Sequence, residues 1–182
     1  HNDLLFFTDR GRAYQIKMFD IPEGKRATRG KSIQNFLQLA DNEKITSILA
    51  MPKDVKSNKK HSMYLITRLG QAKRVALDSF TDVRRSGILA IGLDVGDELL
   101  AALFVDEGDT VILTSREGQS IRFDQDDIRV MGRAAGGVRA MNLDKSDRLV
   151  SADVVKKSAK DAELLVMTAH GYGKKTPLTE YK

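Results

Sequence analysis

Four short apolar runs recur along the chain, and each is followed by a Thr or Ser, two further residues and a glycine. The four copies occupy residues 5–11, 64–70, 112–118 and 165–171. An apolar run of this length that stops at a turn signal predicts a buried strand. The glycine predicts the positive φ of a tight hairpin, and a hydroxyl three residues before it can hydrogen-bond the turn backbone. Each copy therefore predicts a strand that enters a hairpin turn.

The register continues beyond each glycine. Second strands of the hairpins are predicted at 12–17, 71–75, 119–123 and 172–176. Ten positions after every glycine stands an apolar residue, preceded by a residue suited to a turn or cap: Ile21 after Asp20, Phe80 after Ser79, Ile128 after Asp127 and Tyr181 after Glu180. The glycines recur at intervals of roughly 50 to 60 residues, at or just above the period of solenoids and propellers. The sequence therefore predicts an array of related units.

Two more strands complete each unit. Third strands are predicted at 32–39, 88–93 and 138–143, and fourth strands at 45–51, 98–104 and 148–155. Polar, basic loops at 22–31, 81–87 and 129–137 precede the third strands. Phe36 and Leu37 also suit a helix, but the matching positions of the other units favour strand, and no long segment keeps a 3.6-residue apolar period. The sequence thus predicts an all-β, propeller-like fold built from repeated four-stranded blades.

The repeat units have approximate limits. They are expected at residues 1–51, 63–105 and 110–155, with a partial unit at 164–182. Charged or polar linkers at 53–60 and 156–161 separate the units. Three full units and a partial one predict an open arc or a reduced ring with exposed terminal edges.

Composition narrows the class of protein. The 182 residues are 41% hydrophobic and 30% charged, as in a globular protein. No run of 18 apolar residues is present, so neither a transmembrane helix nor a membrane partner is expected. The absence of cysteine excludes disulfides, thiolate metal ligands and cysteine nucleophiles, and it fits a reducing cytosol. The net charge of +5 permits a polyanionic partner.

No group of residues forms a recognisable catalytic constellation. Neither a Walker-type phosphate loop nor a Gly-x-Gly-x-x-Gly turn between strand and helix occurs. The acidic pairs at 97–98, 106–107 and 126–127 are interpreted as turn and cap residues, because no nucleophile or histidine accompanies them. His1, His61 and His170 are isolated in sequence and are interpreted as surface or turn residues. We therefore expect no catalytic residue, metal site or cofactor in this chain.

Basic residues recur at matching places of the units. Four residues after the glycines stand Gln15, Arg74, Arg122 and Lys175, and Lys73 and Lys174 stand one residue earlier in their copies. The loops add Arg26, Arg29, Lys31, Arg84, Arg85, Arg133 and Arg139. On blades set around an axis these side chains would form a common belt. Duplex DNA presents one phosphate charge per ~1.7 Å, so such a belt can bind it without reading bases. The alternative is that they are ordinary solvated surface residues.

Several phrases resemble the C-terminal domain of the DNA gyrase A subunit. These are residues 4–12 with Ile21-Pro22-Glu23 and Arg29-Gly30, the loops at 84–91 and 130–139, and the phrase at 171–178. The resemblance covers essentially the whole chain. It implies a β-pinwheel, a propeller-like ring whose blades exchange a strand with their neighbours, and residues 1–182 would be a fragment of one such domain.

The resemblance also implies a function. The family's domain binds double-stranded DNA and wraps it around a basic outer rim, so that the type IIA topoisomerase can introduce negative supercoils. The implied partners, in an A2B2 assembly, are the gyrase B subunit together with the rest of the gyrase A subunit. The implied location is the bacterial cytoplasm, in association with the nucleoid. ATP and Mg²⁺ serve the holoenzyme, whose catalytic residues lie in other domains.

One departure from the family pattern concerns the wrapping. The family's Gln-Arg-Arg-Gly-Gly-Lys-Gly box is absent, and its nearest internal relatives are the loops at 26–31, 84–87 and 133–137. We therefore expect this chain to bend DNA poorly even where it binds. Topoisomerase IV, whose corresponding domain is a smaller and more degenerate ring, is the alternative within the family. A protein-interaction propeller and a stand-alone enzyme are the alternatives outside it, and no catalytic residues support the enzyme.

Overall fold

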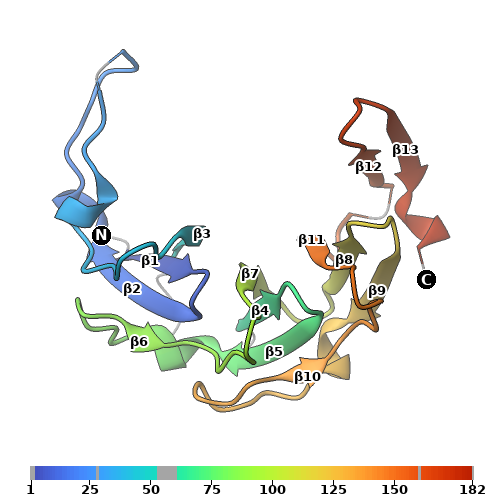
Figure 1. Ribbon diagram of the computed structural model, residues 1–182, viewed down its shortest axis with the longest axis horizontal. Coiled ribbons are helices and arrows are strands. Elements are labelled where there is room, and N and C mark those ends of the chain that lie inside the picture. Colours follow the sequence, from blue (N-terminus) through green and yellow to red (C-terminus); the bar gives the residue numbers. More distant parts are fainter. Residues whose placement is uncertain (1–2, 28, 53–60, 160, 182) are drawn as a thin grey trace.

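The strands form four antiparallel sheets that follow one another along an open arc (Figure 1). The computed structural model describes residues 3–27, 29–52, 61–159 and 161–181. In that part of the chain all regular structure is β-strand or short 3-10 helix. The predicted all-β, propeller-like class is therefore confirmed.

Each sheet is built around one of the predicted hairpins. The first has the order β3 (Ile45–Ala50), β1 (Asp3–Thr8), β2 (Arg12–Lys17), β6 (Ile88–Leu89). The second has the order β7 (Leu99–Val105), β4 (Ser62–Thr67), β5 (Gln71–Ala76), β10 (Val138–Arg139). The third contains β11 (Leu149–Val155), β8 (Thr110–Ser115) and β9 (Ser120–Asp124), and the fourth contains β12 (Glu163–Met167) and β13 (Gly173–Pro177). Among the described residues, two sheets thus have the four strands that the sequence predicts.

In each four-stranded sheet the edge strand that pairs with the second hairpin strand, β6 or β10, comes from the next repeat. β6 follows the second hairpin in sequence, but it pairs with β2, where Ile88 faces Ala13. In the same way β10 pairs with β5, where Val138 faces Ala72. This exchange joins each sheet to its successor, which confirms the β-pinwheel arrangement.

The hairpin turns have the predicted conformation. Gly11, Gly70, Gly118 and Gly171 have φ angles of +71°, +88°, +88° and +84°. The hydroxyls of Thr67, Ser115 and Thr168 each accept a hydrogen bond at 3.2 Å from the backbone N–H four residues later. Thr8 instead donates to the Glu43 carboxylate at 2.6 Å. The glycine and the hydroxyl therefore act together in these turns.

Two of the turn glycines also receive the exchanged segment. The Gly70 carbonyl accepts hydrogen bonds from the N–H groups of Ala140 and Met141, at 2.9 and 3.2 Å. The Gly11 carbonyl accepts the equivalent bonds from residues 90 and 91, at 2.8 and 3.2 Å. A Cβ on Gly70 would lie 2.6 Å from the Met141 oxygen, closer than atoms can pack. The junction between repeats therefore requires glycine for its space as well as for its φ angle.

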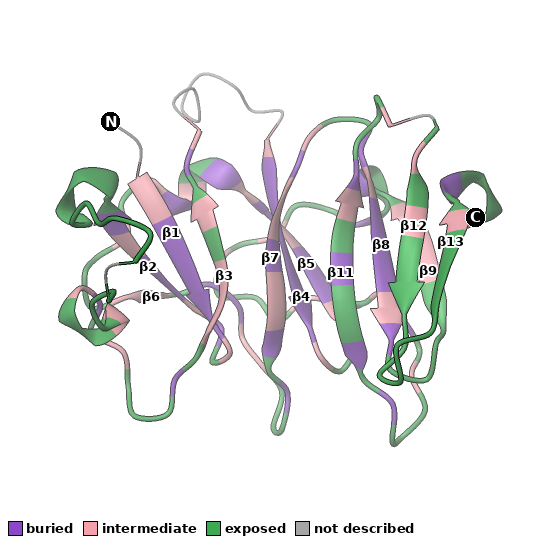
Figure 2. Cartoon of the chain, turned by 90° about the horizontal axis from the view of Figure 1, so that it is seen from above, coloured by how far each residue is buried: buried purple, intermediate pink, exposed green. Residues whose placement is uncertain are grey.

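Neighbouring sheets pack face to face and enclose the core between them. β4 is buried along its whole length, because both faces of the second sheet are covered (Figure 2). Leu65 of β4 lies in one apolar cluster with Leu5 of the first sheet, and Ile66 lies in another with Leu113 of the third. Successive side chains of a strand point to opposite faces, so a continuous apolar run fills both interfaces.

Short 3-10 helices follow the hairpins at the places where turn and cap residues were predicted. They are η1 (Met18–Asp20), η3 (Leu77–Phe80), η4 (Gln125–Asp127) and η5 (Leu178–Glu180). In η4 the side chain of Asp124 and that of Asp127 each accept a hydrogen bond from the other residue's backbone N–H, which forms a capping box. Of these, η3 and η4 lead into the loops that precede the exchanged strands β6 and β10.

The prediction of a strand at 32–39 is wrong. This segment contains the 3-10 helix η2 (Ile33–Asn35), and none of its residues belongs to a strand. Leu37 is buried against Phe6, Tyr14 and Ile16 on the face of the first sheet. The outer edge of β2 already pairs with β6, so the segment packs on its own sheet through side chains instead.

Candidate nucleic-acid interface

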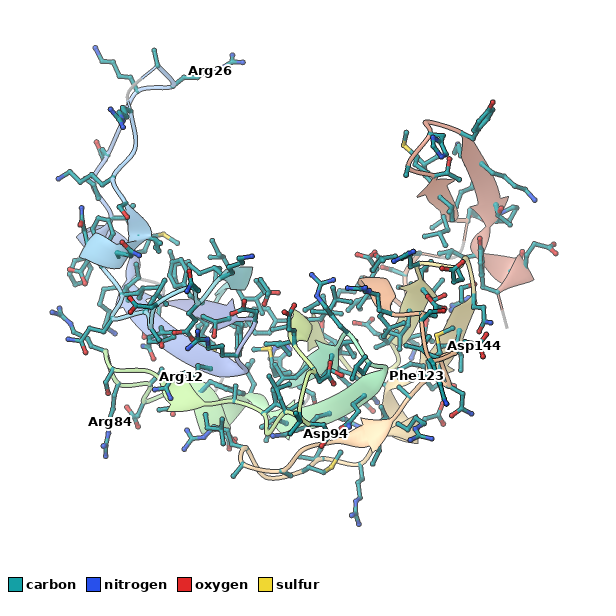
Figure 3. The ribbon with its side chains drawn as sticks, in the orientation of Figure 1. Arg12, Arg26, Arg84, Asp94, Phe123 and Asp144 are labelled. Atoms are coloured by element: carbon teal, nitrogen blue, oxygen red, sulfur yellow. The ribbon has the colours of Figure 1, made fainter. Side chains whose placement is uncertain are left out.

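The convex side of the arc carries the exchanged strands and the loops that lead into them. β6 and β10 lie on this side, whereas β3, β7 and β11 line the concave side (Figure 1). We call residues 81–89 the first edge segment and residues 129–139 the second edge segment. Four arginines in the two segments are exposed, namely Arg84, Arg85, Arg129 and Arg139. The Arg84 side chain points away from the arc (Figure 3).

The first edge segment is held by side chains of β2 in the preceding sheet. Arg12 Nη2 donates to the Ser86 carbonyl at 2.9 Å, and Gln15 Oε1 accepts from the Val83 N–H at 3.2 Å. Gly87 lies against the Tyr14 ring, which a Cβ at this position would approach to 2.6 Å. These contacts fix the backbone on both sides of Arg84 and Arg85 and leave their side chains in solvent.

The Tyr14 side chain is in turn held by a buried carboxylate. Its hydroxyl donates to Glu43 Oε2 at 3.0 Å, and Arg12 Nε donates to the Tyr14 oxygen at 3.2 Å. Burial raises the pKa of Tyr14 above its ordinary value. Burial also raises the pKa of Glu43, but the hydrogen bonds from Thr8, the Ala40 N–H and Tyr14 outweigh it, and the pKa is lowered overall. Tyr14 therefore remains a neutral donor to an ionised Glu43 at physiological pH.

The expectation that Lys73 lies on the exposed belt is wrong. The side chain is fully buried, and Nζ donates to the carbonyls of Ala90 at 2.9 Å, Ala135 at 2.8 Å and Arg133. Burial, aided by the Arg133 charge, lowers the pKa of Lys73 to about 8. Lys73 therefore has no free donor for a DNA phosphate.

Arg74 and Arg122 lie between successive repeats and not on an exposed belt. Arg74 Nη1 donates to the Gln125 carbonyl at 3.0 Å and pairs with Asp126 at 2.9 Å. Arg122 Nη1 donates to the Leu178 carbonyl at 2.9 Å. Both guanidinium groups thus reach the 3-10 helix of the next repeat, and both residues are only partly exposed. The prediction of one common belt that includes these two residues does not match their placement.

A second contact recurs at the same position of all four hairpins. The residue four positions after the glycine contacts, through its side chain, the residue that stands twelve positions earlier than itself in the sequence. The pairs are Gln15 with Asp3, Arg74 with Ser62, Arg122 with Thr110 and Lys175 with Glu163. This polar pair across the hairpin fixes the direction of the long side chain, so that it points towards the next repeat in the first three copies.

The remaining predicted residues are divided among three places. Arg26 lies at the far tip of the loop at one end of the arc, away from Arg84, and Arg29 and Lys31 of the same loop are exposed (Figure 3). Arg133 is partly buried, and its Nη1 donates to the Ser79 carbonyl at 3.1 Å. Lys174 and Lys175 are exposed on β13 at the other end. The structure therefore brings only Arg84, Arg85 and Arg139 of the predicted set onto the convex side as exposed groups.

Sequence reasoning missed Arg129. It is exposed and begins the second edge segment, one residue after the buried Ile128. The available signal was its place in a polar loop between the 3-10 helix and the exchanged strand. With Arg129 included, each edge segment presents two exposed arginines.

The described residues show no sign of a metal centre or a membrane span. No cluster of three or more His, Cys, Asp or Glu side chains within them is arranged to hold a metal ion. None of their helices has the length and apolar character to cross a membrane.

Comparisons with known proteins agree on one family. A family model described as "DNA gyrase C-terminal domain, beta-propeller" matches residues 2–50, 61–106, 109–156 and 162–182. The DNA gyrase A subunit of Mycolicibacterium smegmatis is 40% identical over 185 residues, and that of Haloquadratum walsbyi is 37% identical over 183 residues. Both alignments cover 100% of this chain and 21% of the relative. The chain thus spans about a fifth of the length of these curated relatives.

Solved structures give the same assignment. The C-terminal domain of DNA topoisomerase IV superposes with a TM-score of 0.88 at 26% identity, and the gyrase A C-terminal domain with 0.80 at 26% identity. Each superposition covers 100% of this chain, and they cover 55% and 56% of the respective solved chains.

Proposed function

The chain belongs to the DNA gyrase C-terminal domain family, and we propose on that basis that it is a DNA-binding part of a gyrase A protein. The four exposed arginines of the two edge segments carry this proposal. Their side chains lie on loops whose backbone is held by the preceding sheet, so the attachment points of the cations are fixed before DNA arrives. Contacts of this kind bind the phosphate backbone and carry no base specificity.

The convex shape suggests how the duplex is bound. Successive sheets place successive pairs of arginines along a curved edge, and a duplex that follows this edge must bend. Bending a site of 20–30 base pairs costs of order 1–6 kcal/mol, which phosphate contacts have to offset. The chain lacks the family's Gln-Arg-Arg-Gly-Gly-Lys-Gly box. We therefore propose that it contributes to DNA wrapping within the full-length protein but bends DNA weakly by itself.

The parent protein is proposed to be the A subunit of a type IIA topoisomerase, which acts with a B subunit in the bacterial cytoplasm. Gyrase is favoured over topoisomerase IV, because the curated relatives at 37–40% identity are gyrase A subunits. The described residues are proposed to form one part of a single pinwheel domain, and catalysis is assigned to the rest of the holoenzyme.

Salt dependence of DNA binding tests this function. The slope of log K against log salt is negative, and each lost phosphate contact reduces its magnitude by about 0.9. We expect R84E/R85E to make this slope less negative by about 2, measured by fluorescence anisotropy with a mixed-sequence duplex.

The matched control reverses two exposed arginines outside the edge segments, Arg116 and Arg148, which are neighbours because the Arg116 N–H donates to the Arg148 carbonyl. R116E/R148E changes the net charge equally and should leave the slope close to that of the unmodified chain. Equal losses in the two variants would show that only net charge matters and would contradict the proposed interface.

A further inference from the structure

We propose that Lys73 is a positioning residue for DNA binding: its buried ammonium group fixes the path of the second edge segment and thereby the placement of Arg129 and Arg139. The proposal rests on the proposed function of the edge segments. Lys73 itself does not contact the duplex, because its side chain is fully buried.

The geometry of the ammonium group leaves no donor unused. An ammonium group has three N–H donors, and Lys73 Nζ has three carbonyl acceptors. One is Ala90, which follows the exchanged strand β6, and two are Arg133 and Ala135 in the second edge segment. A single side chain of the second sheet thus ties together the backbone at Ala90, one residue after the first edge segment, and the backbone in the middle of the second.

Other contacts also hold the second edge segment. In its middle the Gly92 N–H donates to the Ala135 carbonyl at 3.3 Å, and Arg133 Nη1 donates to the Ser79 carbonyl at 3.1 Å. At one end the Met131 N–H donates to the Arg74 carbonyl at 2.8 Å. At the other end Val138 pairs with Ala72, and a Cβ on Gly137 would lie 2.9 Å from the Ala72 carbonyl oxygen. Between these anchors, residues 134–136 are exposed. Lys73 adds two charge-assisted hydrogen bonds to the backbone carbonyls of residues 133 and 135, in the middle of this loop.

A buried lysine lowers the stability of the fold through its desolvation unless its ammonium group makes hydrogen bonds that offset this loss. Burial lowers the pKa of Lys73 to about 8, so the group stays protonated at neutral pH and keeps its three donors. An apolar side chain of the same length would fill the space without the desolvation cost of a buried charge. Packing alone therefore does not explain the lysine, whereas three converging carbonyls do.

In the first sheet an uncharged side chain stands at the position that corresponds to Lys73 and contacts the edge segment. Tyr14 stands three residues after Gly11, as Lys73 stands three residues after Gly70. Tyr14 presents its ring to Gly87 of the first edge segment, and its hydroxyl bonds to Glu43. Lys73 bonds to Ala90, just after residues 81–89, whereas β2 side chains hold the first edge segment itself, so this segment provides an internal reference for the second.

A double-mutant cycle on DNA binding tests the proposal. The 182-residue chain carries K73M alone, R129E/R139E alone, and both together, and its affinity for a mixed-sequence duplex is measured at fixed salt. We expect K73M to weaken binding and to make R129E/R139E less damaging, by about threefold or more, since coupled residues are non-additive on this scale. R84E/R85E should weaken DNA binding by the same factor in the presence and absence of K73M.

Controls separate positioning from loss of stability. Ile112→Ala creates a cavity in the cluster of Ile112, Val155 and Leu178, outside both edge segments. It should lower the unfolding temperature but leave the cost of R129E/R139E unchanged. If K73M behaves in the same way, Lys73 is merely structural and the proposal is overturned.

Hydrogen exchange tests the positioning without DNA. In K73M the amides of Met131 and Ala135 should exchange faster, while the amide of Val83, which Gln15 holds, should not change. Unchanged protection at Met131 and Ala135 would overturn the positioning role. If the unmodified chain fails to bind DNA while the exchange result holds, the proposed function fails and the role of Lys73 in fixing the loop remains.

Discussion

Backbone carbonyls bind the long cationic side chains that follow the hairpin glycines of the second and third sheets. Lys73 meets three carbonyls, and Arg122 meets the carbonyl of Leu178. The Leu178 carbonyl also accepts the Tyr181 N–H at 3.2 Å, and a carbonyl has room for a second donor, so a cation can add a charge-assisted hydrogen bond. A basic residue near the edge of this fold is therefore as much a part of its backbone bonding as of its surface charge.

Glycine can be required in a hairpin turn for its positive φ or for the lack of space for a Cβ, and Gly70 and Gly118 allow these two effects to be distinguished. Both have a φ of +88°, but a Cβ at Gly70 would lie 2.6 Å from the Met141 oxygen, whereas nothing lies within 4 Å of one at Gly118. Gly118→Ala should therefore cost only the left-handed backbone penalty, about 1–2 kcal/mol. Gly70→Ala should cost clearly more, because the exchanged segment has to move.

Urea unfolding of the two glycine variants at one pH measures the difference directly. Equal losses would show that the close approach of the exchanged segment has no energetic weight.

A cluster of charged side chains predicts how stability depends on pH. Lys156 Nζ lies 2.8 Å from Asp106 Oδ2 and 2.8 Å from Asp109 Oδ2. The hydrogen bond from Lys156 lowers the pKa of Asp106. Burial raises the pKa of Asp109, but the bonds from Lys156 and from two backbone N–H groups outweigh it and lower the pKa overall.

Because both carboxyls have a lower pKa in the folded chain, the folded state binds fewer protons than the unfolded state near their ordinary pKa of 3.8. Their stabilisation is therefore present above about pH 4 and is lost as the pH falls through the folded pKa values. Lys156→Met should flatten this acid limb of the curve of unfolding free energy against pH. Lys145→Met, at an exposed turn position, is the control and should leave the limb unchanged.

Strands and turns of neighbouring repeats are joined by side chains of one repeat that contact the next. The hairpin β12–β13 has few buried side chains of its own, and β13 continues into η5, whose Leu178 packs with Ile112 of the third sheet. Arg122 adds a hydrogen bond from β9 to the Leu178 carbonyl. The docking of this hairpin therefore depends on a small apolar contact and one guanidinium group.

Arg122→Met should loosen the last hairpin. The substitution removes a charged hydrogen bond to a carbonyl, worth about 1.5–3 kcal/mol. We expect faster hydrogen exchange across residues 163–181 and unchanged exchange in β4. Lys175→Met is the control, since its side chain is 63% exposed and its pair with Glu163 should contribute at most about 1 kcal/mol. Similar effects of both substitutions would contradict the role of Arg122.

The hairpins could be predicted well from the sequence, because the signal is local. A hydroxyl, two residues and a glycine determine the turn wherever they occur, and the inner strands follow from their apolar runs. The prediction fails at 32–39 because the apolar residues of this segment suit either a strand or a packed turn, and the choice depends on which sheet edge is free. The strand exchange of β6 and β10 was implied only by the family resemblance.

The burial of Lys73 could not be foreseen from its residue type. Its neighbour Arg74 has nearly the same sequence context, but successive residues of a strand face opposite ways, and only one of the two faces a packed loop. The placement of Arg74 and Arg122 had a usable signal. Ser62 and Thr110 stand twelve residues before them, and a hydroxyl at that distance in a hairpin predicts a polar pair across the two strands.

At the scale of the whole molecule, exchange of strands decides where the charge lies. Because each outermost strand pairs with the preceding sheet, the loop that leads into it crosses the convex side of the junction between two sheets. Arginines on these loops are thereby brought to the outside of the arc, although the core of each sheet is assembled from its own repeat. The exchanged strands thus account for the position of these arginines on the convex side.

The most direct test of this account locates the DNA on the protein. The chain contains no cysteine, so single cysteines can be introduced at exposed positions and labelled with an iron chelate that cleaves nearby DNA. Ser86 and Ala134 report on the two edge segments, and Ser151 of β11 reports on the concave side. The account predicts cleavage of bound duplex from Ser86→Cys and Ala134→Cys and little from Ser151→Cys. Cleavage that is strongest from Ser151→Cys would place the duplex on the concave side and contradict the account.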